Sequence, residues 1–314
     1  MPMHPLFDLH CDTLYECLQQ EKSLTDNDLN LSFDRLAGYG RFVQVLAMWS
    51  NWQLTEEEAW QRFGMARDLL ASELAKNPAV RLCTSNAELA ACEADGTGAV
   101  FFAVEGGKLL ADDITRVDAL HAAGVRFLTL VWNSVCKIGG GHDTDEGLTP
   151  FGYEVVRRCL DLGIIPDVSH ASDKMTDEVL ALCEAAGKVC IATHSNSRAM
   201  CDHRRNLTDE RFRRIAKLGG VVGVSLAPHH LTRGESCTVQ DVVRHIEHYL
   251  SLVGENADCL GCDLDGVGTL PQGIESVSDL YKIADRLGQN GHSDDCIGKI
   301  FYANARNFIS LWLN

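Results

Sequence analysis

The chain has 314 residues, of which 46% are hydrophobic and 23% charged, and its formal net charge is −16. This composition is typical of a globular protein with a large core, and the acidic balance argues against nucleic acid or an anionic membrane surface as the main partner. No apolar run is long enough to cross a bilayer and no signal-like segment opens the chain, so we expect a cytoplasmic protein.

Eight short apolar or β-rich runs follow one another, and we expect strands over residues 7–13, 41–49, 98–107, 125–133, 163–169, 188–193, 220–227 and 259–264. Helical patterns separate most of them, over residues 55–75, 112–123, 150–162, 172–187, 208–218 and 239–253. Residues 16–36 are irregular, and two more helical patterns close the chain over 277–287 and 293–313. Thr55 and Glu58 have the spacing of a capping box.

Eight βα units in about 300 residues are typical of a (β/α)8 TIM barrel, and no linker divides the chain. We therefore predict an α/β fold with one barrel domain over residues 1–314 and extra carboxyl-terminal helices. A doubly wound open sheet is the alternative. Its glycine-rich phosphate loop would normally follow the first strand, where His10, Cys11 and Asp12 stand instead.

Thirteen cysteines are scattered through the predicted strands and helices, which predicts reduced thiols in a chain without a secretion signal. Cys259 and Cys262 have the spacing of a redox or zinc pair, but no second pair accompanies them. Because strand alternation would place their sulfurs on opposite faces, we interpret both as packing residues.

Residues that can bind metals or transfer protons fall at the carboxyl ends of five predicted strands: His10, Asp12, Glu105, His170, His194 and Asp263. On the first strand, alternation puts His10 and Asp12 on one face and Leu9 and Cys11 on the other. In a barrel, these strand ends converge on the face where barrel enzymes carry out their chemistry. Each residue alone could be an ordinary buried or solvated side chain, but together they predict a metal site.

The ligand types favour Zn²⁺, with Mn²⁺ or Fe²⁺ as alternatives, because three imidazoles are combined with carboxylates. Five ligands exceed the needs of one catalytic ion with an open position. They suit two ions that share a bridging carboxylate, which can hold a hydroxide at neutral pH and polarise a carbonyl oxygen. Hydrolysis of an amide or a related bond requires this combination.

Six motifs, in order along essentially the whole chain, resemble the membrane (renal) dipeptidase family of zinc peptidases: His10-x-Asp12, VEGG at 104–107, DVSH at 167–170, THS at 193–195, RRN at 204–206 and DLDG at 263–266. The resemblance implies an amidohydrolase-type barrel with two zinc ions per chain. One ion would be held by His10, Asp12 and Glu105, and the other by Glu105, His170 and His194.

The resemblance also implies that Asp263 transfers protons near the bridging hydroxide, with Asp265 as an alternative. Arg205 would bind the free carboxylate of a dipeptide, a task that suits a guanidinium group. It could instead be a surface residue of the basic run 204–214.

One position departs from the family pattern. The family's substrate-contacting histidine on the fourth strand corresponds to Trp132, so an imidazole near the developing oxyanion is missing unless Asn133 or His142 replaces it. We therefore predict that Trp132 and Asn133 contact the substrate. The change puts substrate choice and rate in question and leaves the metal centre intact.

We predict a zinc-dependent dipeptidase in which a metal-bridging hydroxide attacks the peptide bond, and the resemblance allows a D-residue at the carboxyl-terminal position. Because Trp132 changes the pocket wall, the alternative is another reaction on the same metals, such as deamination or hydrolysis of a cyclic amide or lactone. A catalytically silent barrel used for binding is a further alternative. The apolar stretch 300–313 could form a homodimer, but we expect it to close its own barrel.

Overall fold

The structure is a computed structural model, and it describes residues 3–313. Its strands are β1 (Leu6–Cys11), β2 (Phe42–Trp49), β3 (Val80–Leu82), β4 (Gly98–Glu105), β5 (Val125–Thr129), β6 (Ile165–Asp167), β7 (Val222–Val224) and β8 (Asp258–Leu260). All paired strands run parallel and form one curled sheet in the order β6-β5-β4-β2-β1-β8-β7, with β3 beside β4. The predicted α/β class and parallel sheet are confirmed.

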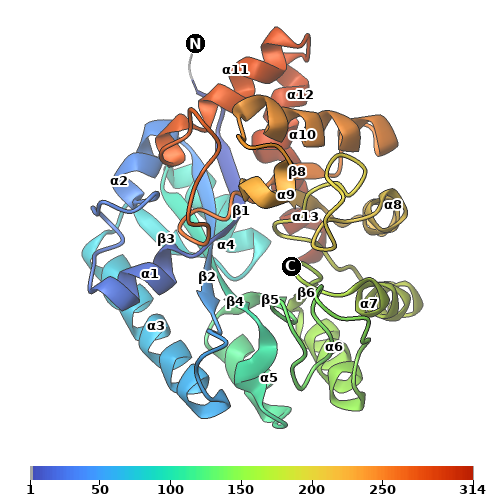
Figure 1. Ribbon diagram of the computed structural model, residues 1–314. Helices are drawn as coiled ribbons and strands as arrows, with labels where there is room; N and C mark the ends of the chain where they lie inside the picture. The colour runs from blue at the N-terminus through green and yellow to red at the C-terminus, as the bar shows by residue number, and fades with distance from the viewer. Residues whose placement is uncertain (1–2, 314) are drawn as a thin grey trace.

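The helices are α1 (Thr13–Gln20), α2 (Phe33–Leu36), α3 (Glu56–Lys76), α4 (Asn86–Asp95), α5 (Thr115–Ala122), α6 (Pro150–Leu162), α7 (Asp173–Ala186), α8 (Asp209–Lys217), α9 (Pro228–Leu231), α10 (Val239–Val253), α11 (Tyr281–Gln289), α12 (Asp294–Gly298) and α13 (Asn304–Trp312). Shorter helical segments are η1 (Ala37–Tyr39), η2 (Gly107–Leu110), η3 (Val277–Asp279) and the π-helical η4 (Lys299–Ala303). Figure 1 shows α1, α3, α5, α6, α7 and α8 around the outside of the strands. Within residues 3–313, none of the helices combines the length and apolar character that crossing a membrane requires.

Several outer helices begin at a serine or threonine that caps the first turn. Thr55 and Glu58 form the predicted capping box, in which each side chain accepts from the other residue's backbone N–H. Thr149 caps α6 in front of Pro150, whose fixed φ suits the first helical position. Such caps satisfy N–H groups that have no partner inside the helix, so each helix starts at a defined residue.

Residues 188–193 differ from the prediction, because the structure has two isolated parallel bridges there in place of a strand. Asp167 pairs with Ile191, and Ala192 pairs with Val222. The ladder stops at Thr193 because its N–H donates to the side chain of Asp167, at 2.9 Å, and not to a backbone carbonyl. Two elements, β3 and α4, were not predicted; β3 has only three residues, which carry too little pattern to recognise.

Strand β1 contains an irregularity just before its functional residues. Asp8 pairs with Gln44 whereas Cys11 pairs with Leu46. Between these two pairs, β1 therefore contains one residue more than β2. Such a bulge breaks the alternation of side chains and is common beside active sites. The expectation that Leu9 and Cys11 share a face is therefore wrong: they belong to different core clusters.

The hydrophobic core has two parts. The larger lies between the sheet and the outer helices, where Phe63 of α3 stacks on Phe102 of β4 at 5.5 Å between ring centroids. The smaller, which we call the inner cluster, joins alternate strand residues to side chains of α4, η4 and α13. In it, the ring of Phe7 lies 6.4 Å from Phe101 and 6.1 Å from Tyr302. The inner cluster fills the sheet interior with apolar side chains and leaves the strand carboxyl ends to polar ones.

The cysteines and the carboxyl-terminal stretch pack within the fold. All thirteen cysteines fall within the described residues and are free thiols there. Cys259 packs in the inner cluster and Cys262 in the larger one, which are opposite sides of the strand. In the stretch 300–313, Phe301 and Phe308 are buried against their own chain. The homodimer remains a prediction.

Candidate metal centre

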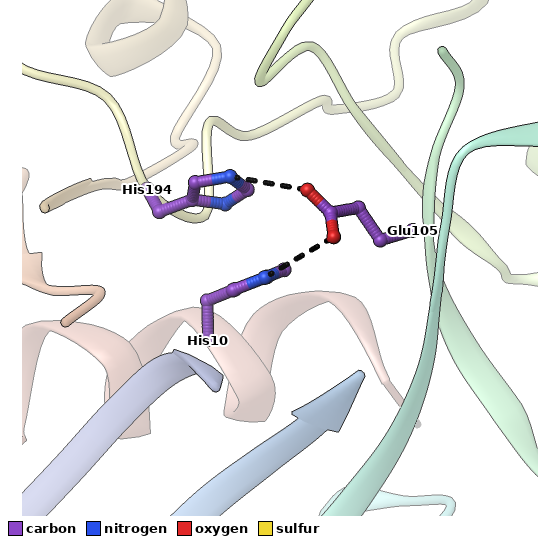
Figure 2. A group of neighbouring side chains, drawn as sticks. All are labelled: His10, Glu105 and His194. Atoms are coloured by element: carbon purple, nitrogen blue, oxygen red, sulfur yellow. Dashed lines mark ion pairs between the residues drawn. The ribbon is translucent and has the colours of Figure 1, made fainter. Parts of the chain in front are cut away.

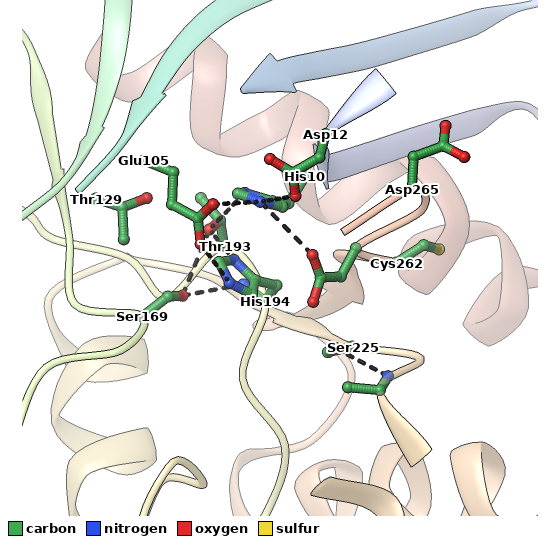
Figure 3. A network of polar contacts seen from close by, with 12 residues as sticks. His10, Asp12, Glu105, Thr129, Ser169, Thr193, His194, Ser225, Cys262 and Asp265 are labelled. Atoms are coloured by element: carbon green, nitrogen blue, oxygen red, sulfur yellow. Dashed lines mark hydrogen bonds and ion pairs between the residues drawn. The ribbon is translucent and has the colours of Figure 1, made fainter. Parts of the chain in front are cut away.

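The six residues at the predicted strand ends come together at one end of the sheet. His10 lies in β1, Asp12 occupies the N-cap of α1, and Glu105 ends β4. The other three, His170, His194 and Asp263, lie in loops that follow β6, the 191–192 bridges and β8. Figure 3 shows His10, Asp12, Glu105 and His194 converging within one polar network. The predicted convergence of strand ends is therefore observed.

Glu105 stands between two groups of ligand atoms. Its Oε2 lies 3.8 Å from His10 Nε2, whereas its Oε1 lies 2.9 Å from His170 Nε2 and 3.5 Å from His194 Nε2. Figure 2 shows His10 and His194 directed at different oxygens of this carboxylate. A carboxylate that bridges two ions needs this division of its oxygens.

Among residues 3–313, two clusters have ligand atoms close enough to share an ion. One is His10, Glu105 and His194, and the other is His10, Asp12 and Asp263, with one ligand atom of each residue within 4.8 Å of the others. In the second, His10 Nε2 lies 3.5 Å from Asp12 Oδ2 and 3.8 Å from Asp263 Oδ1. Imidazole nitrogen and carboxylate oxygen are ligands that Zn²⁺ and related ions accept. The site can therefore hold a metal.

Two unsatisfied atoms support this fit. Within residues 3–313, His10 Nε2 and Asp12 Oδ1 are buried and have no hydrogen-bond partner. Buried polar atoms in native proteins are nearly always paired with protein, water or an ion. His10 Nε2 lies among the carboxylate oxygens of Asp12, Glu105 and Asp263, so its missing partner belongs in the cluster.

The charges of the site also favour a cation. Burial opposes protonation of His10, but its contact with Asp12 and the charges of Glu105 and Asp263 outweigh burial and raise its pKa to about 10. Burial, followed by repulsion from Asp12, raises the pKa of Glu105 well above its usual range. These shifts reflect an excess of negative charge. A bound divalent ion would offset it.

The imidazoles of His170 and His194, on the Oε1 side of Glu105, favour the neutral form. Burial, with the nearby charges of Arg205 and His10, lowers the pKa of His170 and His194 well below the usual value. A neutral imidazole keeps the lone pair that binds a metal.

A hydrogen-bond network behind the cluster fixes the orientation of the imidazoles. Thr193 Oγ1 lies 2.8 Å from His194 Nδ1 and donates to Asp167 Oδ2 at 2.6 Å. Thr129 Oγ1 donates to the same oxygen at 2.5 Å. Such outer contacts set the ring orientation of metal-binding histidines. Asp167 and Thr193 stand in two of the sequence motifs but no role was predicted for either, although a carboxylate in a buried strand was a usable signal.

Trp132 and Asn133, two of the three residues predicted to contact substrate, line the cavity above the cluster. This cavity measures about 590 Å³ and includes Trp132, Asn133 and His142 in its wall. Asn133 Oδ1 lies 2.8 Å from His170 Nδ1, so it also orients that imidazole. His142 is anchored by its backbone N–H, which donates to His170 O at 2.7 Å, and its Nδ1 is buried without a partner among the described residues.

Arg205 is buried, which rules out the surface interpretation. It is only 4% exposed, and its guanidinium donates to Ser195 Oγ and to the backbone oxygen of His194, both at 2.8 Å. In the part of the chain that the structure describes, its Nε has no partner. One donor of a buried guanidinium is therefore free for an anion.

The loop after β8 distinguishes Asp263 from Asp265. Asp265 accepts from Thr13 Oγ1 and Asn30 N, both at 2.6 Å, and Figure 3 shows it apart from the cluster. Asp263 faces the cluster, and burial raises its pKa to about 7. Both residues have a positive φ, +61° for Asp263 and +66° for Asp265, so their side-chain contacts and not their backbone conformation distinguish them.

Comparison with known proteins identifies relatives over the whole length. Residues 1–310 match the membrane dipeptidase family, peptidase family M19. Human dipeptidase 3 is 30% identical over 240 residues, which cover 71% of this chain and 48% of that protein. The chain thus spans about half the length of this curated mammalian relative.

Two solved structures share the fold. A dipeptidase described as a family M19 metallopeptidase superposes with a TM-score of 0.91 at 26% identity, covering 100% of this chain and 99% of that one. A metallopeptidase from Rhodobacter sphaeroides, bound to a phosphinate mimic of the dipeptide L-Ala-D-Ala, gives a TM-score of 0.89 at 27% identity, covering 99% of both chains.

Proposed function

The chain belongs to the membrane dipeptidase family of metallopeptidases, and from this premise we propose that it hydrolyses the peptide bond of dipeptides with two bound zinc ions. The observation that carries the proposal is Glu105, whose two carboxylate oxygens face separate sets of ligand atoms. His10 and Asp12 would complete one zinc site with Glu105. His170 and His194 would complete the other.

We also infer that the sheet closes as a (β/α)8 barrel. The support comes from residues 191 and 192, which pair with β6 on one side and with β7 on the other. This segment fills the place of the strand missing between β6 and β7 in the sheet order. Closure of the sheet into a barrel would bring His194 across from β1. His194 and His10 could then belong to the same metal site.

In the proposed reaction, two bound zinc ions would lower the pKa of a water molecule and polarise the scissile carbonyl. Asp263 would take a proton from the attacking water and pass it to the nitrogen of the leaving amine. The position of its Oδ1, 3.8 Å from His10 Nε2, supports this role because it lies beside the proposed zinc site of His10, Asp12 and Glu105. Asp265 is already engaged with Thr13 and Asn30.

The buried guanidinium of Arg205 would bind the free carboxylate of the dipeptide. Its unpartnered Nε supports this assignment, because a carboxylate accepts readily from a guanidinium edge. Trp132 and Asn133 would contact the substrate from the cavity wall. We include dipeptides with a carboxyl-terminal D-residue as substrates, since the R. sphaeroides relative was solved with a mimic of L-Ala-D-Ala.

The test compares Asp263→Asn with the matched variant Asp265→Asn. Loss of the proton-transferring group predicts that Asp263→Asn lowers kcat by about 10²- to 10⁴-fold while the metal content stays unchanged. Asp265→Asn should retain most of the turnover. Steady-state kinetics with L-L and L-D dipeptides, together with elemental analysis, measures both quantities.

Two outcomes would contradict the proposal. Near wild-type turnover by metal-loaded Asp263→Asn would remove this residue from the mechanism. Cleavage of cyclic amides without cleavage of any dipeptide would replace the proposed reaction.

A further inference from the structure

A second cavity, of about 880 Å³, adjoins the metal centre, and we call it the side cavity. It shares Trp132 and Asn133 with the cavity above the metal ligands. Gly106, the residue after Glu105, also lines it. A side chain of a bound ligand could thus enter the side cavity while the backbone of that ligand remains at the metal centre.

Two large apolar side chains of the side cavity are held in contact with water. Trp52 is 60% exposed and Val135 is 58% exposed, and both line the cavity. Exposed apolar surface next to a cavity is typical of ligand-binding sites. The backbone at Trp52 is fixed, because Lys108 Nζ donates to its carbonyl oxygen at 2.8 Å. This hydrogen bond links the Trp52 loop to η2.

The inner end of the side cavity carries an unsatisfied polar atom. Ser50 lines the cavity and is 3% exposed, and its Oγ has no hydrogen-bond partner within the described chain. Its backbone N–H donates to Glu105 O at 2.8 Å, which fixes Ser50 beside the metal centre. The Ser50 hydroxyl could contact the polar backbone of a substrate residue near the metal centre. The apolar side chains of Trp52 and Val135 could then contact the side chain of that residue.

The position of Arg205 decides which residue of a dipeptide would enter. Arg205 is bonded to residues 194 and 195, which follow the segment between β6 and β7. Ser50 and Gly106 follow β2 and β4, which β5 and β6 separate from that segment in the sheet order. With its carboxylate at Arg205 and its scissile carbonyl at Glu105, a dipeptide would extend its amino-terminal residue toward the side cavity.

We propose that the side cavity receives the side chain of the amino-terminal residue, and that the preferred dipeptides carry a large apolar or aromatic residue there. This inference rests on the proposed dipeptidase function. The indole of Trp52 and the side chains of Trp132 and Val135 provide the apolar contact. A glycine or alanine at this position leaves that surface in water.

The two lysines of the side cavity already have partners, which argues against an anionic occupant. Lys137 Nζ is paired with Asp112 at 2.7 Å, and Lys108 donates to backbone carbonyls. Glu56 is the remaining acid that lines the cavity beside Asp143, so a cationic residue is the competing occupant. The experiment therefore includes arginine.

The test measures kcat/KM of the metal-loaded chain on a series X-Ala, with X as Gly, Ala, Leu, Phe, Trp, Arg or Glu and with both stereoisomers of alanine. We expect kcat/KM to rise at least about tenfold from Gly to Phe, since even small apolar groups are discriminated to that extent. In Trp52→Ala, this Phe-to-Gly ratio should fall by about fivefold or more. Val135→Ala should lower the ratio in the same direction.

Leu311→Ala is the control, because Leu311 is 64% exposed and lies in α13, at the other end of the fold. It should leave the ratio unchanged. A flat series, a preference for arginine, or an equal loss on Gly-Ala and Phe-Ala in Trp52→Ala would overturn the inference. Failure to cleave any dipeptide would instead overturn the proposed function.

Discussion

The two ends of the sheet use the same strands for opposite purposes. At the amino end, the inner cluster packs Phe7 against Tyr302 and buries Phe308, with aromatic rings in contact. At the carboxyl end, carboxylates and imidazoles crowd together, and His170 and Asp263 hold positive φ values of 69° and 61°. The first arrangement gains stability from apolar burial, whereas the second contains strain and unpaired charge. The contrast shows that stability and chemistry are separated along the strands, as barrel enzymes in general separate them.

The largest expected effect is on activity, at the carboxyl end. Glu105→Gln keeps the shape of the side chain but removes the charge and the second equivalent oxygen, so it should lower kcat by about 10³-fold or more. Metal stoichiometry should fall, and the metal-free variant should unfold at the same temperature as the metal-free wild type or a higher one, because a buried charge is gone. Kinetics, elemental analysis and thermal unfolding measure these three quantities.

The matched control for this change is Glu235→Gln, at an exposed position. It should behave as the wild type does. If Glu105→Gln retained both its metals and its turnover, the separation of chemistry from stability would not hold at this residue.

The next effect is on stability, at the amino end. Phe308→Ala removes a ring that is 1% exposed within the inner cluster, and the cavity should lower the free energy of unfolding by about 3–5 kcal/mol. Turnover per folded molecule should stay close to the wild-type value. Urea unfolding of the metal-free chain and kinetics at low temperature test the two statements, and Leu311→Ala in the same helix should change stability by less than about 0.5 kcal/mol. A loss of turnover in the folded Phe308→Ala would show that the two ends are coupled.

The smallest effect concerns the network behind the metal ligands. Thr193→Val removes the hydroxyl that joins His194 to Asp167, and the metal affinity should fall by about 10- to 100-fold. Thr193→Ser retains the hydroxyl and should restore the affinity. Competition with a chelator measures the metal affinity directly. Equal affinities of the valine variant and the wild type would show that the network does not orient His194 for metal binding.

Much of the fold could be predicted because patterns within a few neighbouring residues determine where many helices and strands form. The capping box of Thr55 and Glu58 lies within one turn, and the apolar run of β4 marks a strand buried on both faces. Residues 188–193 could not be predicted correctly, since their ladder ends where a side chain 26 residues away accepts the N–H of Thr193. The bulge in β1 likewise depends on its register with β2.

For the candidate site, the sequence alone determined which residues gather. His10, Glu105 and His194 stand at strand ends, and parallel strands joined by helices must bring those ends to one edge. Only the tertiary structure decided how they meet. It turned the two oxygens of Glu105 toward different imidazoles and buried Arg205 behind His194. It also opened the side cavity beside Trp132. These features depend on distances between strands far apart in the chain, and packing sets those distances, whereas the residue pattern along any one strand does not.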